Sequence, residues 1–208
     1  MEETDSMENV EDTGEEEKIK DSDKTRSEKK EITALDLKFL VKELREEVTG
    51  GMVRKIYQYS GSKTKQFLFE MFIPTKGGLW LYVDKQKMFI TKRKKASPQE
   101  PPSFCMFLRK HMMGKKIEDI KQHGFDRIIE ISTHENILIF ELFSQGNAIL
   151  CDKSYNIIMP LQMQKWRDRE VKPKIPYKYP PKVTDPFDMD LDSLKRSLAK
   201  NEKKVIPC

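Results

Sequence analysis

Residues 116–161, KIEDIKQHGFDRIIEISTHENILIFELFSQGNAILCDKSYNIIMPL, carry the pattern that decides the fold. Apolar side chains recur here with a period of about two, which is the period of a β-strand rather than of an amphipathic helix. Short turn sequences such as His123-Gly124 and Gln145-Gly146 interrupt the pattern. The stretch therefore predicts five strands in succession: Lys116–Gln122, Arg127–Thr133, Ile137–Phe143, Asn147–Cys151 and Asn156–Leu161.

A second series of strands lies upstream, and a helix precedes each series. The upstream strands are predicted at Val53–Tyr59, Gln66–Ile73, Leu79–Asp84 and Met88–Lys92. The first helix is predicted to begin after Thr33 as N-cap and to end at Gly50-Gly51, and the second to begin at Ser103 as N-cap and to end at Gly114. This order predicts an α+β domain with flanking helices on a two-sheet β-sandwich or barrel.

The 208-residue chain has a net charge of +5, but its N-terminal segment differs strongly in charge from the rest. Residues 1–30 contain 12 acidic and 6 basic side chains and no aromatic residue, so we predict a disordered acidic leader over residues 1–31. The remaining residues, 31–208, carry a net charge of +11. We predict a folded domain over residues 32–182, and a linker with the start of a truncated helical region over residues 183–208.

The periodic pattern ends at Leu161. The segment KPKIPYKYPP, residues 172–181, predicts an extended basic strap of polyproline-like character. A last helix is predicted at Leu191–Glu202, with Asp190 as its N-cap.

Composition and motifs exclude several classes of protein. The acidic N-terminus does not resemble a secretory signal, and no apolar stretch is long enough for a membrane span. Cys105, Cys151 and Cys208 are odd in number and irregularly spaced, which favours reduced and mostly buried thiols over a disulfide framework. The sequence shows no zinc-ligand spacing and no enzyme motif, so we predict no catalytic residue, no metal and no cofactor.

Basic side chains gather in several clusters along the body. Each cluster alone is best interpreted as a solvated surface, but together with the charge of +11 they favour a partner with a phosphate backbone. Trp166-Arg167-Asp168-Arg169 and the strap add further basic residues. This charge does not distinguish DNA from RNA; the candidates for contact with such a backbone are Lys92, Arg93, Lys94, Lys95, Arg109, Lys110 and His111.

Three other polar residues have plain structural interpretations. Asp36 is three residues from Thr33 and suits a capping box. Asp126 and Arg127 suit a turn aspartate followed by a strand arginine.

Four segments taken together resemble the N-terminal domain of the NFACT family, which includes NEMF-like and RqcH-like factors. The resemblance covers about residues 32–182 and is closest to archaeal members. The segments are TALDLKFL at 33–40, with Gly50-Gly51 and KIYQ at 55–58; PPSFCMFLRKH at 101–111; GFDRI at 124–128; and EL at 141–142 followed by NAIL at 147–150.

The resemblance implies a fold similar to the N-terminal domain of Fpg/MutM-type DNA glycosylases and a role in ribosome-associated quality control. It implies cytoplasmic binding to tRNA, typically alanyl-tRNA, and to a large ribosomal subunit that carries a stalled peptidyl-tRNA. Such binding supports mRNA-independent C-terminal tailing of the nascent chain. Family members depend for tRNA recruitment on an aspartate in the first helix and on an Asp-Arg pair, which match Asp36, Asp126 and Arg127. No membrane or DNA partner is expected.

Two departures from the family are visible. The acidic leader is an extension, and the sequence does not contain the helix-hairpin-helix region, the coiled coil and the second RNA-binding domain of full-length members. A fragment, a truncated product or the product of a split gene is therefore expected. Two alternatives stay open: a DNA glycosylase of the Fpg type, although the chain lacks that family's N-terminal Pro-Glu and zinc ligands, and a fibronectin-binding surface adhesin, although it shows no signal sequence.

Overall fold

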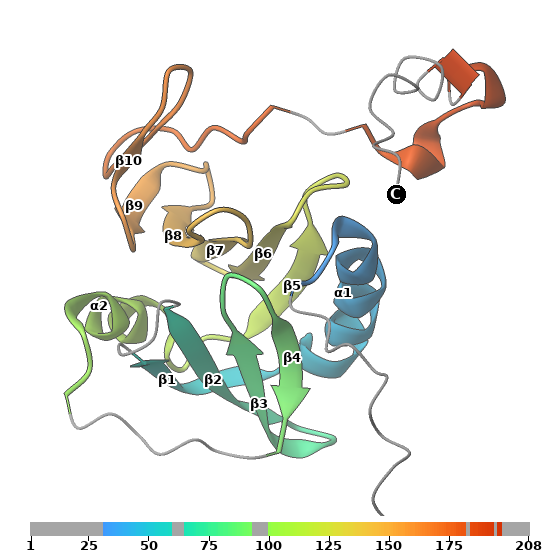
Figure 1. Ribbon diagram of the computed structural model, residues 1–208. Helices are drawn as coiled ribbons and strands as arrows, with labels where there is room; N and C mark the ends of the chain where they lie inside the picture. The colour runs from blue at the N-terminus through green and yellow to red at the C-terminus, as the bar shows by residue number, and fades with distance from the viewer. Residues whose placement is uncertain (1–30, 60–64, 93–99, 182–183, 194, 197–208) are drawn as a thin grey trace, which may run out of the picture. The chain divides into compact units, whose positions relative to one another are not determined.

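The computed structural model of this protein describes residues 31–59, 65–92, 100–181, 184–193 and 195–196 (Figure 1). Two antiparallel sheets, whose strands pair in chain order, make up most of the fold. The first sheet consists of β1 (Met52–Tyr59), β2 (Gln66–Ile73), β3 (Gly77–Val83) and β4 (Met88–Thr91). The second consists of β5 (Ile117–Gln122), β6 (Ile128–Thr133), β7 (Asn136–Glu141), β8 (Asn147–Asp152) and β9 (Ile157–Pro160). Both predicted strand series are confirmed, and small shifts occur only at the strand ends.

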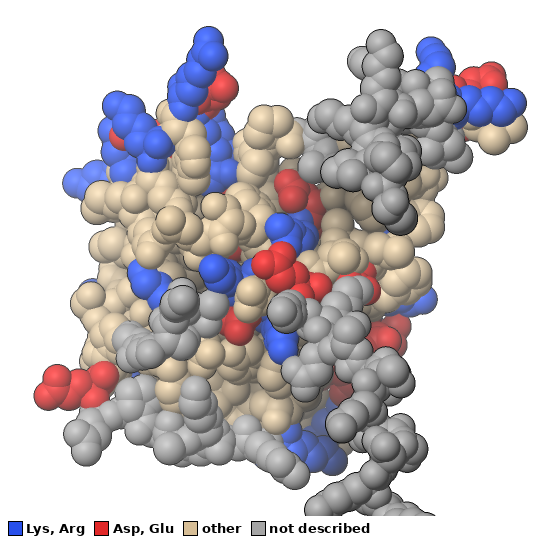
Figure 2. Space-filling model, viewed as in Figure 1, with Lys and Arg blue, Asp and Glu red and all other residues tan. Residues whose placement is uncertain are grey.

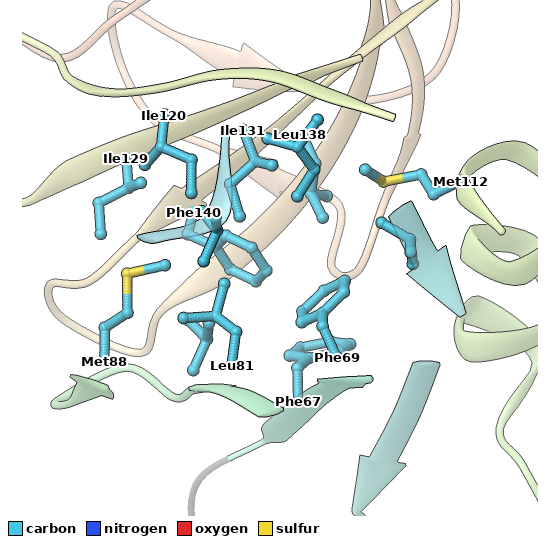
Figure 3. Packing of buried hydrophobic residues seen from close by; sticks show 14 of the residues in the cluster. Phe67, Phe69, Leu81, Met88, Met112, Ile120, Ile129, Ile131, Leu138 and Phe140 are labelled. Carbon is cyan, nitrogen blue, oxygen red and sulfur yellow. The ribbon is translucent and has the colours of Figure 1, made fainter. Parts of the chain in front are cut away.

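Aromatic side chains from both sheets meet in the main hydrophobic core. The ring of Phe140 on β7 lies edge-on to Phe67 and Phe69 on β2, with centroid distances of 5.8 and 6.0 Å. Figure 3 shows these three rings pointing toward one another between the two sheets. The two sheets therefore pack face to face, which confirms the predicted α+β fold with its two-sheet core.

Helix α1 (Ala34–Val48) forms as the sequence predicts. Thr33 is the N-cap, and its capping box with Asp36 is complete. Leu37, Leu44 and Val48 are almost fully buried, and this apolar face of the helix packs against β5. Gly50, just beyond the helix, has a φ of +84°, a left-handed conformation in which a residue with a Cβ would be strained.

Helix α2 (Ser103–Met112) begins one residue earlier than its predicted cap implies. Pro102, not Ser103, is the N-cap, and its side chain forms no capping hydrogen bond. The carbonyl of Pro102 already accepts the N–H of Met106 at 3.1 Å, so Ser103 becomes the first helical residue. Cys105 faces the core, and its thiol donates to the carbonyl of Ile56 at 3.4 Å.

The described residues between Leu161 and Asp188 form more regular structure than the sequence pattern predicts. A short hairpin forms from β10 (Gln164–Lys165) and β11 (Glu170–Val171), and a 3-10 turn, η1, spans Pro186–Asp188. Of the predicted last helix, the structure describes helical residues at 191–193 and 195–196. The N–H of Ser193 donates to Asp190 Oδ1 at 2.6 Å, as the predicted N-cap requires.

The strap is a structural layer and not only a basic surface. Its Tyr177 lies in a second apolar cluster on the outer face of the second sheet, where it packs with Ile139 and Ile149. The Tyr177 hydroxyl donates to Glu141 at 2.7 Å, and the Tyr179 hydroxyl donates to Glu130 at 2.6 Å. Both carboxylates are almost fully buried, and burial raises the pKa of both tyrosines, which keeps these donors protonated.

Two further predictions concern the thiols and the membrane. Cys105 and Cys151 are buried free thiols, and burial raises the pKa of Cys151 to about 12. Cys208 and the acidic leader over residues 1–30 lie outside the described residues. Within the described part of the chain, no helix combines the length and the apolar character that crossing a membrane would require. The described residues also contain no cluster of three or more acidic, His or Cys side chains that could hold a metal ion.

Candidate nucleic-acid interface

Three segments far apart in the sequence meet at the N-terminal end of α1. The Gln122 amide nitrogen, at the end of β5, donates to the carbonyl of Ala34 at 3.0 Å and to the carbonyl of Asp126 at 2.7 Å. The N–H of Ile32 donates to the carbonyl of Gln86, in the turn between β3 and β4, at 2.8 Å. Side-chain and backbone bonds thus tie the start of α1 to the β5–β6 turn and to the β3–β4 turn.

Asp36 is fixed in the first turn of α1. Its Oδ2 accepts the Thr33 N–H at 2.8 Å and the Thr33 hydroxyl at 2.6 Å, and its own N–H donates to Thr33 Oγ1 at 3.2 Å. The structural interpretation of Asp36 as a capping residue is therefore confirmed. The same bonds hold its carboxylate at the helix end that Gln122 ties to the β5–β6 turn.

Asp126 and Arg127 lie in that turn and are both half-buried. Asp126 Oδ1 accepts the backbone N–H of Arg127 at 2.7 Å, and Gly124 supplies the left-handed residue of the turn with a φ of +54°. The guanidinium of Arg127 extends to Glu31, with Nη1 3.1 Å from Oε2. Asp126 therefore shapes the turn, and Glu31 contacts the arginine side chain.

Glu31 is a member of this site that sequence reasoning missed. The hydrogen bond from Arg127 holds the pKa of the Glu31 carboxyl below its ordinary value. The Glu31 side chain is 56% exposed, and an ion pair at such a site contributes little to stability. A phosphate oxygen could therefore replace Glu31 on the guanidinium of Arg127 at small cost.

The beginning of the C-terminal segment lies against the same end of α1. Lys38 Nζ is 3.2 Å from Asp185 Oδ2 and 4.3 Å from the centre of the Phe187 ring. Phe187 also contacts Phe125 of the β5–β6 turn, with a centroid distance of 6.2 Å. No short-range sequence signal could have revealed these contacts, because they join residues more than 60 positions apart.

The predicted basic contacts on α2 are not part of this cluster. Figure 1 shows α2 and α1 on opposite sides of the two sheets. Arg109 has a structural partner, because its Nε donates to the carbonyl of Ile56 at 2.7 Å. His111 packs on Phe107 at a centroid distance of 4.5 Å, and burial lowers its pKa, whereas Lys110 is exposed.

The other predicted basic cluster begins at the end of β4. Lys92 is exposed there, and Arg93, Lys94 and Lys95 lie outside the described residues. The structure thus brings together the positions of Asp36, Asp126 and Arg127 and separates them from the α2 candidates.

Comparison with known proteins gives consistent results. Residues 33–207 match the family model described as NFACT N-terminal and middle domains. The chain is 32% identical over 170 residues to the archaeal Rqc2 homolog aRqcH of Methanocaldococcus jannaschii, which covers 78% of this chain and 25% of that protein. It is 34% identical over 133 residues to the ribosome quality control complex subunit 2 of Saccharomyces cerevisiae, which covers 62% of this chain and 13% of that protein.

A third relative and a solved structure are consistent with the family match and with the two relatives above. The chain is 31% identical over 183 residues to the Rqc2 homolog RqcH of Bacillus subtilis, which covers 78% of this chain and 31% of that protein. The crystal structure of the N-terminal domain of the fibronectin-binding protein PavA of Streptococcus pneumoniae is similar, with a TM-score of 0.69, 25% identity and coverage of 82% of this chain and 69% of that chain. The chain spans less than a third of the length of the curated relatives named here.

Proposed function

This chain belongs to the NFACT family of ribosome quality control factors, and we propose that it is the tRNA-binding module of such a factor. In this proposal, it binds tRNA, preferentially alanyl-tRNA, together with a large ribosomal subunit that carries a stalled peptidyl-tRNA. It acts in the cytoplasm, without a catalytic residue or cofactor of its own, and supports the mRNA-independent tailing of the stalled chain.

The meeting of the α1 N-terminus with the β5–β6 turn is the observation that supports this proposal. A guanidinium binds phosphate oxygens or a base edge through paired N–H donors, so Arg127 is suited to contact RNA. Asp36 and Asp126 cannot contribute attraction to a phosphate, because their charge repels it. Their use would be specific hydrogen bonds to an RNA hydroxyl or a base amine.

Replacement of Arg127 by alanine is expected to weaken tRNA binding by about tenfold, because a charge-assisted bond to RNA is worth about 1–3 kcal/mol. Asp126→Ala should also weaken binding, since it removes the side-chain acceptor that shapes the turn. The measurement is the tRNA affinity of the purified chain at several salt concentrations. Arg127→Ala should lower the slope of log affinity against log salt by about 1.

Arg45→Ala is the matched control for the arginine variant. Arg45 lies in the last turn of α1 and pairs with Asp119 at 2.7 Å, so this variant removes the same charge and a similar ion pair away from the site. Its tRNA affinity should stay close to that of the wild type. Equal losses for Arg45→Ala and Arg127→Ala would show that only net charge matters and would refute the assigned site. Binding to immobilised fibronectin without binding to tRNA would favour the adhesin alternative.

Deletion of residues 1–30 is expected to raise affinity for RNA. This segment carries a net charge of −6, and removing it leaves a chain with a net charge of +11. If the acidic segment competes with RNA for the basic body, its loss should strengthen binding, and most strongly at low salt, where screening is weak. Equal affinities of the full-length and shortened chains at low salt would reject this competition.

A further inference from the structure

A second basic surface lies on the β10–β11 hairpin and the strap, residues 164–178, here called the hairpin–strap surface. This stretch contains six basic and two acidic side chains, a net charge of +4. Figure 2 shows Lys and Arg gathered over the place where Figure 1 labels β10. The hairpin and α1 are drawn on opposite sides of the second sheet in Figure 1, so this surface is separate from the Arg127 site.

Trp166 is held as an exposed aromatic platform on the hairpin. One side of its indole is supported by Arg169, whose guanidinium carbon is 4.7 Å from the ring centre. The backbone N–H of Trp166 donates to the carbonyl of Arg169 at 2.8 Å. The residue remains 45% exposed, which leaves aromatic surface available to a ligand.

Arg169 supports the platform but is not itself available to bind a phosphate. Its guanidinium pairs with Glu141, and the two side chains are only 9% and 2% exposed. The cation is therefore neutralised and fixed beneath Trp166. This distinguishes it from the basic residues around it, which are solvent-accessible.

Those accessible basic residues border an open hollow of about 380 Å³ beside Trp166. Lys165, Arg167 and Lys178 line it and are exposed. Asp168 and Glu170 also line it, but Glu170 is paired with Lys172 at 3.0 Å. The hollow thus combines an aromatic face with three accessible basic residues.

The surface is fixed to the sheet before any ligand arrives. Asn147 on β8 donates from Nδ2 to Gln164 Oε1 at 2.8 Å, which anchors the start of the hairpin. The strap is anchored by the Tyr177 bond to Glu141 and by the N–H of Lys174, which donates to the carbonyl of Ile157 at 2.8 Å. A preorganised surface loses less conformational entropy on binding.

We propose that the hairpin–strap surface binds a single-stranded segment of RNA. An unpaired base stacks on Trp166, and the adjoining phosphates contact Lys165, Arg167 and Lys178. Cations beside an exposed aromatic ring are the combination by which proteins bind single strands without sequence readout. This site adds a second RNA contact to the proposed function and does not depend on Arg127.

Tryptophan fluorescence provides a direct test, because the chain contains only Trp80 and Trp166. In a Trp80→Phe background of the full chain, titration with a short oligoadenylate RNA should quench the remaining Trp166 emission in a saturable manner. The triple variant Lys165→Ala/Arg167→Ala/Lys178→Ala should bind at least tenfold more weakly, with a salt slope lower by about 2. Binding of a labelled oligoadenylate to Trp166→Ala, followed by anisotropy, should be weaker by roughly tenfold and does not depend on the Trp80 replacement.

The matched control removes three exposed basic residues elsewhere: Arg45→Ala/Lys76→Ala/Lys153→Ala. This variant should retain more affinity for oligoadenylate than the hairpin triple. Absence of quenching, or equal quenching by polyglutamate, which has no bases, would overturn the proposal; the second result would point to an acidic protein partner. Arg127→Ala should keep the Trp166 quenching. Unchanged tRNA binding by Arg127→Ala would therefore refute the proposed tRNA site alone, whereas absence of quenching would refute only the hairpin–strap site.

Discussion

Phe140→Ala is expected to lower the free energy of unfolding by about 3–5 kcal/mol. Phe140 is 2% exposed, and it contacts Phe67 and Phe69 across the space between the two sheets. The variant loses both the burial of the ring and the contacts that it makes, and a cavity remains because the two sheets cannot fully collapse onto it. Urea denaturation followed by circular dichroism measures the change.

Phe39→Ala is the control for this core variant. Phe39 lies on α1 and is 60% exposed, so its truncation should change the free energy of unfolding by less than about 1 kcal/mol. If Phe140→Ala cost no more than Phe39→Ala, the face-to-face packing of the two sheets through these rings would be wrong.

The second large effect is expected from Glu141→Ala, which should destabilise the protein by about 3–5 kcal/mol. Glu141 accepts from the Tyr177 hydroxyl and pairs with Arg169, and both of its partners are largely buried. Its removal leaves a buried guanidinium without its carboxylate and a buried hydroxyl without its acceptor. The same denaturation measurement applies, and limited proteolysis should show faster cleavage within residues 164–178 as the strap loosens.

A double substitution distinguishes the cost of leaving Arg169 buried without its carboxylate from the cost of losing the ion pair itself. Glu141→Leu/Arg169→Leu removes both charges and should recover much of the lost stability, because no buried charge is left without its partner. Glu118→Ala is the exposed control: Glu118 pairs with Lys153 at 2.9 Å and is 44% exposed, so the change should be within about 0.5 kcal/mol. A double variant as unstable as Glu141→Ala would contradict the assignment of the loss to an unpaired buried charge.

Short-range sequence signals predicted most helices and strands correctly, because interactions between residues a few positions apart determine these elements. The capping box at Thr33 and Asp36 uses residues three apart, and the strand series follows a short-range alternation. The N-cap of α2 was assigned to Ser103 instead of Pro102 because the preference for serine at N-caps is strong, while the backbone conformation that decides the cap is not visible in composition.

The sequence of β7 and β8 also indicates that a further layer covers the outer face of the second sheet. Every residue of β7 is buried, and β8 is buried from Asn147 to Cys151, so these strands have apolar surface on both faces. A continuous apolar run such as ILIF at 137–140 indicates a strand covered on both sides. That run could have predicted that some segment covers this face, although not that the strap does so or that Tyr177 and Tyr179 would meet Glu141 and Glu130 there.

The residues of the candidate site were named from the family resemblance, and their roles remain predictions. Their proximity depends on Gln122, which donates both to the carbonyl of Asp126 in its own turn and to the carbonyl of Ala34, 88 positions earlier in the sequence. Glu31 and Phe187 could not have been assigned to this place from the sequence, since neither has a local pattern that distinguishes it.

The sequence by itself determined the order of helices and strands from α1 to β9 and the family. It did so because capping, alternation and motif spacing act over a few neighbouring residues. Only the tertiary structure decided which charges are accessible: it commits Arg169 to Glu141, leaves Arg167 exposed beside Trp166, and places Arg127 against Glu31. Such pairings depend on side chains that lie close only after distant strands have packed, and burial, not residue type, then determines whether a cation can bind RNA.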